Sequence, residues 1–473
     1  MSAPIKIKDS LSGDNKDLPK KIRLFVCGPT VYDFSHIGHA RTYLAFDAFV
    51  RYLRVKHFKI FYLQNITDVD DKIIDRAKKE KIEPDNLAKK FEKEYFRDMK
   101  NLNVQSVNKY APATKYIKEI QNQIARLIEK GYAYETKSGV YFEIKKFKDY
   151  GKLSRQQLEE LRIGYRFELD HSKKDPLDFA LWKFRPKTEK GWPSLWGYGR
   201  PGWHIEDTAI SEKFFGLHYE LHGGASELKF PHHEAEIAQA RALSGEEEFV
   251  NIWMHTGLLL VNGKKMGKSL GNFITIRDFL GRHSADALRL MVLKFHYSSP
   301  FNYTEELADE NEKNMDDIKM FLEKLEMIIK NKNAQSAESD ISAEVKECQK
   351  KCTESLENNF NTSMAFAAIS GLISAVQPKI WTLSRSNAKI IHEFIFKSFK
   401  MFGFFLEMPK IPASIQKLAA KRELYRDNKQ FIQSDDLRKR VNSLGYIIED
   451  SKIGTFIWPD QQLKNNQPSE EQS

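Results

Sequence analysis

The chain has little cysteine and no long apolar run. Three cysteines among 473 residues cannot build a disulfide framework, which excludes a small disulfide-stapled scaffold and points to a reducing compartment. No apolar run reaches the roughly 18 residues that a membrane span needs, and the polar first twenty residues lack the apolar core of a signal peptide. We therefore expect a cytoplasmic protein that contacts no membrane.

The chain does have enough apolar material for several cores, and an excess of positive charge. At about 150 residues per domain its length suggests roughly three domains, and 41% hydrophobic residues with 12% aromatic ones suffice for packed cores. Lys and Arg number 75 against 65 Asp and Glu, a net charge of +10. This charge favours attraction to polyanions without identifying one, since many basic soluble enzymes share it.

Strands and helices alternate in two stretches of the sequence. Residues 22–27 have the pattern of a buried strand, a helical pattern starts near Gly38, and residues 58–63 form a second strand. The same alternation returns between residues 219 and 254. This order predicts an α/β fold with a parallel sheet and helices on its faces.

Changes of pattern divide the rest of the chain. Between the two α/β stretches a long helix, a short strand and a Gly/Pro/Trp-rich stretch indicate an insertion, and beyond residue 302 the pattern is almost wholly helical. After Pro409 and Pro412, two basic helices and two short strands form a small module. We expect a mobile polar tail (1–20), the first half of the α/β domain (21–102), the insertion (103–200), the second half (201–256), a segment with a lysine-rich loop (257–303), a helical bundle (304–408), and the C-terminal module with a polar tail (409–473).

A first motif lies where the first strand gives way to a helix. His36 and His39, three residues apart, share a face of the first turn, with Gly38 between them. A helix N-terminus offers unpaired N–H groups that suit a polyphosphate, and Gly38 lets a flat ring approach the backbone. A pair of surface histidines that merely cap the helix is the alternative.

A second motif, Lys-Lys-Met-Gly-Lys-Ser at residues 264–269, follows a predicted hairpin turn. Lys265 and Lys268 on this Gly-containing loop could close over a substrate and neutralise charge that develops at phosphorus in the transition state. A solvated lysine cluster is the alternative.

A third group has the chemistry of a metal site. Cys27 ends the first strand, at the edge where the sites of open parallel sheets form, and His232 and Glu236 open a helix at positions i and i+4. Sulfur, imidazole and carboxylate form a workable zinc set. The alternative for His232 and Glu236 is an ion pair or a phosphate contact at the helix start.

The histidine and lysine motifs, in this order and on these elements, resemble the paired signatures of class I aminoacyl-tRNA synthetases. Residues 27–33 (Cys-Gly-Pro-Thr-Val-Tyr-Asp), 65–71, 202–206 and 230–234 resemble the cysteinyl-tRNA synthetase family in particular. The resemblance implies a Rossmann-type (HUP) catalytic core with an inserted connective subdomain, then an α-helical bundle and a small C-terminal α+β anticodon-binding module. It also implies a monomer that uses ATP with Mg²⁺ to activate L-cysteine, transfers it to tRNA(Cys), and holds one Zn²⁺ that selects the substrate thiol.

The resemblance implies roles for individual residues as well. The catalytic residues would be His36, His39, Lys265 and Lys268. ATP would be bound by these four with Pro29, Thr30, Gly38, Gly223, Gly224, Glu227 and Ser269. The cysteine pocket would be lined by Thr67, Trp203 and His222, and the metal held by Cys27, His232 and Glu236, with Asp207 as a doubtful fourth ligand.

Three positions depart from the family's pattern. Asp207 stands where the bacterial members have a cysteine ligand; it could bind zinc through oxygen, or stand off and leave three protein ligands with a vacancy, which we slightly favour. Gly267 replaces a common serine of the lysine loop. Glu227 replaces an aspartate that is thought to hold the ribose.

Basic residues gather on the two helices of the C-terminal module, with aromatic residues between them. Such a mixture suits phosphate contact and base stacking, although a solvated basic face would look the same. The residues expected to contact tRNA are Lys417, Lys421, Arg422, Arg426, Lys429, Arg438 and Lys439. The pair Cys348 and Cys352 has no further metal ligand nearby in sequence, and we interpret it as incidental.

Two other functions remain compatible with this sequence. One is a tRNA-independent ligase on the same core that couples cysteine to an amino sugar, as in mycothiol synthesis; the basic module argues against it. The other is a catalytically inactive RNA-binding paralogue, against which the complete histidine and lysine motifs argue.

Overall fold

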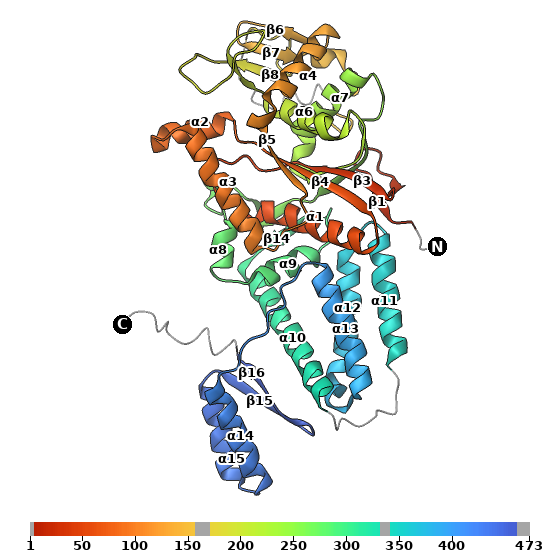
Figure 1. Ribbon diagram of the computed structural model, residues 1–473, viewed down its shortest axis with the longest axis vertical. Coiled ribbons are helices and arrows are strands. Elements are labelled where there is room, and N and C mark those ends of the chain that lie inside the picture. The colour runs from red at the N-terminus through yellow and green to blue at the C-terminus, as the bar shows by residue number, and fades with distance from the viewer. Residues whose placement is uncertain (1–3, 157–170, 332–340, 461–473) are drawn as a thin grey trace. The chain divides into compact units, whose positions relative to one another are not determined.

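The protein is described by a computed structural model that covers residues 4–156, 171–331 and 341–460, with the side chain of Ser269 outside the described part (Figure 1). The chain divides into two compact units. Unit 1 comprises Met1–Asn311, Glu354–Ala365 and Met401–Gly403. Unit 2 comprises Glu312–Thr353, Phe366–Lys400 and Phe404–Ser473.

The core of unit 1 is a five-stranded sheet in the order β11-β10-β3-β4-β5, in which every pair is parallel. The α/β prediction is therefore confirmed. β5 lies inside the stretch expected to be the insertion, so the sheet extends past residue 102. The strands are β3 (Lys21–Val26), β4 (Lys59–Ile66), β5 (Lys109–Pro112), β10 (Tyr219–Ala225) and β11 (Val250–Thr256).

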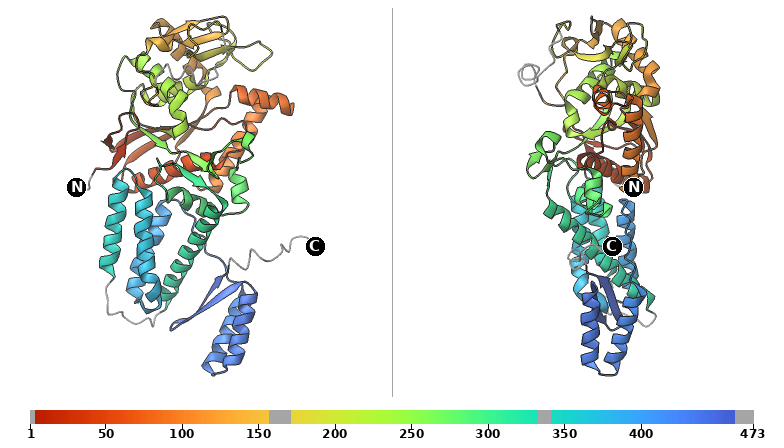
Figure 2. Two further views of the ribbon diagram at one scale, coloured as in Figure 1. Left: turned by 180° about the vertical axis from the view of Figure 1, so that it is seen from behind. Right: turned by 90° about the vertical axis from the view of Figure 1, so that its left-hand side faces the viewer.

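Helices cover the sheet and connect its strands (Figures 1 and 2). The first of them, α1, is buried on all sides over most of its length, because it contacts strands of the sheet as well as two later helices. The helices of unit 1 are α1 (Ile37–Val55), α2 (Asp71–Glu80), α3 (Pro84–Asn101), α4 (Ile117–Glu129), α6 (Trp203–Phe215), α7 (Glu234–Ser244), α8 (Ile276–Leu280) and α9 (Ala285–Leu293).

The insertion forms an antiparallel sheet of its own, in the order β6-β7-β8-β9. Its strands are β6 (Ala133–Glu135), β7 (Gly139–Phe142), β8 (Phe179–Phe184) and β9 (Gly199–Pro201). Trp182 on β8 is fully buried and belongs to the same apolar core as Phe25 of β3, so this sheet packs on the α/β layer.

The first residues are ordered, and the expectation of a mobile tail is wrong for residues 4–20. β1 (Lys6–Lys8) and β2 (Asn15–Asp17) pair as a hairpin, and Ile7 is fully buried. The carboxylate of Asp9 accepts the amides of Leu11, Ser12 and Trp253, which ties the hairpin turn to β11.

The lysine loop starts from a hairpin, as the sequence predicts. β12 (Leu259–Val261) pairs antiparallel with β13 (Lys264–Lys265), and the turn residues Asn262 and Gly263 have φ of 50° and 75°. Two positive φ values are the requirement of a tight hairpin turn of this hand, which asparagine and glycine meet at least cost. β14 (Phe301–Tyr303) completes this small sheet.

The chain beyond residue 304 is helical until the last module. Its elements are α10 (Glu305–Lys330), α11 (Ser342–Glu357), α12 (Thr362–Val376), α13 (Arg385–Met401), α14 (Ala413–Asp427), α15 (Phe431–Ser443), β15 (Tyr446–Ser451) and β16 (Gly454–Pro459). The predicted helical stretch, followed by two helices and two short strands, is confirmed.

One described helical stretch, Thr362–Thr382, is long and apolar enough by length and composition to cross a membrane. The search of the sequence for long apolar runs did not anticipate it. This is weak evidence, because the core helices of soluble proteins pass the same test. Its buried positions, among them Ala365, Ile369, Leu372 and Val376, recur every three or four residues, as in a bundle helix.

Candidate active site and metal centre

A cavity of about 540 Å³ lies at the carboxyl ends of the parallel strands of unit 1. Its wall includes residues that follow β3, β10 and β11 and residues of several helices. His36, Gly38 and His39 line it, and so do Lys265 and Met266. The structure thus brings the histidine and lysine motifs to one cavity, the catalytic cavity.

His36 and His39 cap helix α1 reciprocally. The amide of His39 donates to His36 Nδ1 over 3.3 Å, the amide of His36 donates to His39 Nδ1 over 3.4 Å, and the rings stack with centroids 3.7 Å apart. Burial lowers the pKa of His36 to about 4 and that of His39 well below its ordinary value. Because each Nδ1 accepts, each neutral ring carries its proton on Nε2 and can donate it. The capping role, the alternative in the sequence, therefore coexists with a place in the cavity wall.

Two glycines of the first motif stand where no side chain fits. A Cβ on Gly28 would lie 1.8 Å from the carbonyl oxygen of Asn65, and one on Gly38 would lie 2.9 Å from the ring of His36. Gly28 lets the end of β3 approach the end of β4, and Gly38 keeps the floor of the cavity close to the backbone.

The lysine loop reaches across to carboxylates of the cavity region. Lys265 Nζ lies 2.5 Å from Glu227 Oε1, and Lys268 pairs with Asp33 and lies 5.3 Å from the centre of the Tyr32 ring. Partial burial lowers the pKa of Lys268. Both lysines are thus held by carboxylates at the cavity, and Glu227, expected at the ribose, binds a lysine in this structure.

Of the other residues expected to bind ATP, Pro29 and Thr30 line the catalytic cavity, whereas Gly223 and Gly224 are not among its lining residues. A Cβ on Gly223 would lie 2.2 Å from Phe46 Cζ, so packing against α1 accounts for that glycine. The side chain of Ser269 lies outside the described residues.

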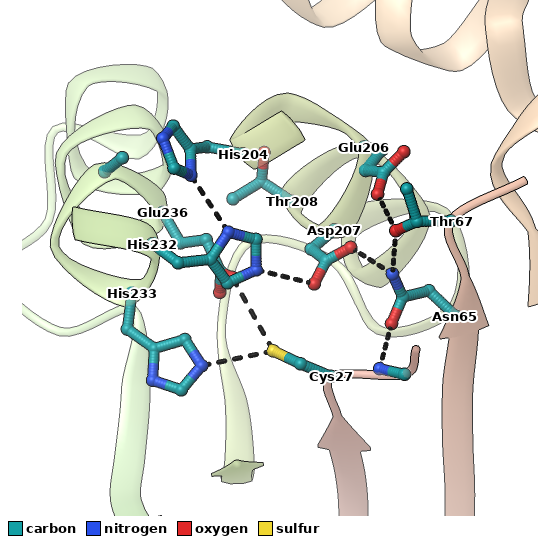
Figure 3. A network of polar contacts seen from close by, with 12 residues as sticks. Cys27, Asn65, Thr67, His204, Glu206, Asp207, Thr208, His232, His233 and Glu236 are labelled. Atoms are coloured by element: carbon teal, nitrogen blue, oxygen red, sulfur yellow. Dashed lines mark hydrogen bonds and ion pairs between the residues drawn. The ribbon is translucent and has the colours of Figure 1, made fainter. Parts of the chain in front are cut away.

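The predicted metal ligands converge around Cys27, which also lines this cavity (Figure 3). Cys27, Asp207, His232 and Glu236 each offer a ligand atom, and these atoms all lie within 4.8 Å of one another. His232 Nε2 is 2.9 Å from Glu236 Oε1, which confirms that their i,i+4 spacing places them on one face. Asp207 does not stand off: its Oδ2 is 3.0 Å from His232 Nε2. The carboxylate therefore lies within reach of a shared cation, and its role as a fourth ligand stays a prediction.

Burial dominates the electrostatics of this group, whose four residues are at most 5% exposed. Burial, reinforced by Glu236, raises the pKa of Cys27 well above its ordinary value, and burial raises that of Glu236 to about 7. Burial alone would lower the pKa of His232, but the carboxylates of Glu236 and Asp207 outweigh it and raise the pKa to about 10. Buried carboxylates with one imidazolium between them are a site that a cation would stabilise.

Asn65 orients this group, a role that sequence reasoning missed. Its Nδ2 donates to Asp207 Oδ1 over 2.6 Å, and its Oδ1 accepts the amide of Gly28 over 2.6 Å. The side chain therefore fixes the Asp207 carboxylate and leaves Oδ2 facing the cluster (Figure 3). The sequence could have suggested this role, because Asn65 is a polar residue at the end of the second predicted strand, which lies beside the first in the sheet.

A second set of ligand atoms shares the same sulfur. His222 Nε2 and His233 Nε2 lie 3.3 Å and 3.1 Å from Cys27 Sγ, and both rings form a group with Cys27 and Glu236. Sequence reasoning missed His233, because the i,i+4 rule selects only His232 and the turn Lys229–His233 before α7 is irregular.

The residues expected in the cysteine pocket differ in accessibility. Trp203 lines the catalytic cavity and stacks on His232, with centroids 4.3 Å apart. Thr67 and His222 are 1% exposed and do not line it; the Thr67 hydroxyl donates to Glu206, and His222 bonds the hydroxyl of Tyr219 over 2.6 Å.

In unit 2, one carboxylate gathers three of the arginines expected at the tRNA. Asp450 accepts two bonds from Arg422, of 2.6 and 2.9 Å, and pairs with Arg426 and Arg438 at 2.6 Å each. Arg422 is only 2% exposed, so it holds the module together, and its assignment as a phosphate contact is wrong. The four lysines of the set, Lys417, Lys421, Lys429 and Lys439, are exposed.

Comparison with known proteins identifies the family. Residues 15–313 match the family model "tRNA synthetases class I (C) catalytic domain". The fold resembles that of Mycobacterium tuberculosis methionyl-tRNA synthetase bound by methionyl-adenylate, with a TM-score of 0.62 at 14% identity, covering 81% of this chain and 90% of the other. The chain belongs to the class I tRNA synthetases.

Curated relatives narrow the assignment. The chain is 42% identical over 441 residues to the cysteine–tRNA ligase of Thermoplasma volcanium, covering 93% of this chain and 96% of the relative. It is 39% identical to that of Caldicellulosiruptor saccharolyticus, covering 92% and 95%. Within the class, the chain belongs to the cysteine–tRNA ligases, enzymes that use ATP with Mg²⁺ to join cysteine to tRNA(Cys).

Proposed function

We propose that the enzyme selects cysteine through a Zn²⁺ ion held by Cys27, His232, Glu236 and Asp207. The observation that carries this proposal is the convergence of these four ligand atoms, which all lie within 4.8 Å of one another. Cys27 belongs both to this group and to the cavity wall, so a substrate beside the ion would also face the nucleotide.

The donor set fits zinc. Thiolate, imidazole and carboxylate are the zinc ligands of proteins, and Glu236 Oε2 is buried without a hydrogen bond to any described residue. Asp207 keeps the charge of a cysteine ligand and offers a harder donor. Zinc bound there would favour the thiolate of the incoming cysteine over the hydroxyl of serine, which is a poor ligand.

The chain's own residues would provide positioning and electrostatics for adenylate formation, in which no side chain acts as a nucleophile. The neutral Nε2–H groups of His36 and His39 would donate to phosphate oxygens without a charge of their own. Lys265 and Lys268 would exchange their carboxylate partners for the phosphates and stabilise the charge that develops as the cysteine carboxylate attacks. Trp203 would cover the amino-acid side of the cavity.

The C-terminal module would contact the tRNA with its exposed lysines and with Arg426 and Arg438. Phe431, 61% exposed on α15 of the same module, would supply an aromatic face for base stacking. A monomer acting in the cytoplasm remains our expectation.

Metal analysis combined with pyrophosphate exchange tests the zinc proposal. We expect about one zinc per chain, exchange that depends on cysteine and not on serine, and loss of that preference after complete chelation with recovery on adding Zn²⁺. Equal preference for cysteine in metal-free protein would overturn the proposal, and a separate melting curve of the chelated protein shows whether it is still folded.

A further inference from the structure

A second cavity of unit 1, of about 320 Å³, lies at the N-terminal hairpin and is distinct from the catalytic cavity. We call it the hairpin cavity; its wall includes Lys8, Ser10, Arg155, Lys229, His255 and Tyr297. None of these residues lines the catalytic cavity. A volume of this size is at the lower end of small-molecule sites.

The hairpin cavity is positively charged. Lys8, Arg155 and Lys229 line it, and none of the three forms an ion pair with any described carboxylate. The one carboxylate of the wall, Asp9, already pairs with Lys16 at 3.2 Å and accepts three backbone amides. Three positive charges around one cavity therefore remain without a counter-ion in the described part of the chain, which favours an anion.

A buried polar atom in the wall lacks a partner. His255 is one of the lining residues and is 3% exposed, and its buried Nδ1 makes no hydrogen bond to any described residue. Its other nitrogen, Nε2, is 2.8 Å from His233 Nδ1. A buried nitrogen without a partner destabilises the fold, so a ligand that bonds it would be stabilised there.

The two imidazoles connect the hairpin cavity to the catalytic site. His255 Nε2 meets His233 Nδ1, and His233 Nε2 lies 3.1 Å from Cys27 Sγ. If His233 Nε2–H donates to a Cys27 thiolate, His233 Nδ1 accepts from His255 Nε2–H, and His255 Nδ1 is then an acceptor. If the Cys27 thiol donates to His233 instead, each proton lies on the other nitrogen, and His255 Nδ1 is a donor. A ligand that carries both an anionic oxygen and a hydroxyl can form a hydrogen bond with His255 Nδ1 in either case.

We propose that the hairpin cavity binds a small phosphate-class anion, held by Lys8, Arg155 and Lys229 and hydrogen-bonded to His255 Nδ1. Hydrogen phosphate and the monoesters of phosphate carry both negative oxygens and, as P–OH or sugar hydroxyl, a donor. The bound anion would fix the ring of His255 and, through His233, the surroundings of Cys27. This inference does not depend on the identity of the metal.

Equilibrium dialysis with radiolabelled inorganic phosphate tests the proposal in the full-length enzyme at constant ionic strength. The catalytic cavity is first filled with a non-hydrolysable cysteinyl-adenylate analogue, so that His36 and Lys265 cannot host the phosphate. We expect one saturable site per chain, weakened about tenfold or more in Arg155→Gln combined with Lys229→Gln, because each removed cation acts at short range.

Lys6→Gln is the matched control for Lys8→Gln. Both lysines are exposed on β1, but only Lys8 lines the cavity. Phosphate affinity should fall in Lys8→Gln and stay within twofold of the parent in Lys6→Gln. The absence of a saturable site, an unchanged affinity in Arg155→Gln with Lys229→Gln, or equal losses in the two β1 variants would overturn the proposal.

Competition and NMR complete the test. Displacement of the label by AMP or by pyrophosphate would identify a nucleotide or a reaction product as the source of the anion, and displacement by neither would identify inorganic phosphate. In protein with ¹⁵N-labelled histidine, phosphate should shift the ring signal of His255 in the parent and not in the Arg155→Gln with Lys229→Gln variant. An unmoved His255 signal at saturating phosphate would contradict the hydrogen bond to Nδ1.

Discussion

The metal group of unit 1 and the basic module of unit 2 are both clusters of charged side chains, but they are built in opposite ways. In the first, Asp207, His232 and Glu236 are at most 1% exposed and contact one another. In the second, most cations are exposed, and a single carboxylate, Asp450, gathers three arginines of which only Arg422 is buried.

This difference separates two kinds of recognition. A small substrate is selected at a desolvated site, where each group acts at low dielectric and its removal is costly. A polyanion such as tRNA is contacted over a wide surface, where each cation contributes little and salt weakens the interaction. Substitutions in the two clusters should therefore differ in size and in salt dependence.

The largest effect is expected for Lys268→Ala, which removes a cation that acts in the transition state. We expect cysteine-dependent pyrophosphate exchange to slow about 10²- to 10³-fold, with a smaller change in KM for cysteine. Lys264→Ala is the control, because Lys264 belongs to the same motif but makes no ion pair with a described carboxylate, whereas Lys268 pairs with Asp33 of the cavity wall. An unchanged kcat in Lys268→Ala would refute the role of the loop.

Asp207→Asn should weaken metal binding by at least 10- to 100-fold, because the neutral amide loses the anionic oxygen beside His232. A chelator competition measures it, and Asp207→Cys should retain the metal. Glu206→Gln is the control, because Glu206 is the neighbouring buried carboxylate but bonds the Thr67 hydroxyl and is not one of the grouped ligand residues. Equal metal affinity in Asp207→Asn and Glu206→Gln would exclude Asp207 as a ligand.

Arg422→Gln should destabilise the module by about 2 kcal/mol, because it breaks a buried pair whose carboxylate keeps two other partners. Hydrogen exchange of peptides from α14 measures this locally. Arg426→Gln, with its side chain 43% exposed, should cost less than about 0.5 kcal/mol. Equal protection of α14 in the two variants would show that burial of Arg422 is unimportant.

Lys421→Gln should weaken tRNA binding only a few-fold and lower the slope of log K against log salt by about 1. Filter binding at several salt concentrations gives both values. Lys452→Gln, exposed at the turn between β15 and β16, serves as the control. A loss of the same size in Lys452→Gln would mean that general charge, rather than the α14 face, attracts the RNA.

The smallest effect is a pH dependence of the module. The hydrogen bonds from Arg422 hold the pKa of Asp450 below its ordinary value, despite partial burial. The stabilisation is therefore present above the unfolded pKa, near 3.9, and is lost as pH falls through the lower folded value. In the parent, the hydrogen-exchange protection of α14 should fall as the solution is made acidic. In Asp450→Asn this protection should be lower at neutral pH and should depend less on pH.

The sequence was sufficient for the α/β core, because strands and helices alternate there with strong apolar periodicity. It was also sufficient for His232 and Glu236, whose spacing fixes a shared helix face. It failed for the N-terminal hairpin, because β1 and β2 are three residues long and mostly polar, and their contacts with β11 lie some 240 positions away.

The sequence also could not predict which side chains pair when they lie far apart along the chain. Arg422 has the same charge as its neighbours, and only the fold shows that Asp450 neutralises it. His233 follows His232 directly, and only the irregular turn before α7 decides that it faces Cys27. A sequence states which charges are present, whereas their pairing depends on the packing.

The reciprocal bonds between His36 and His39 have a consequence for experiments on the signature. Replacing either ring by alanine would fray the first turn of α1 as well as remove a phosphate donor, so a loss of turnover could not be assigned to chemistry alone. Asparagine at position 36, a good N-terminal helix residue, would preserve the fold of that turn while shortening its reach toward the nucleotide. Helix capping and phosphate contact thus depend on the same two rings, and a comparison of the alanine and asparagine variants at position 36 separates these roles.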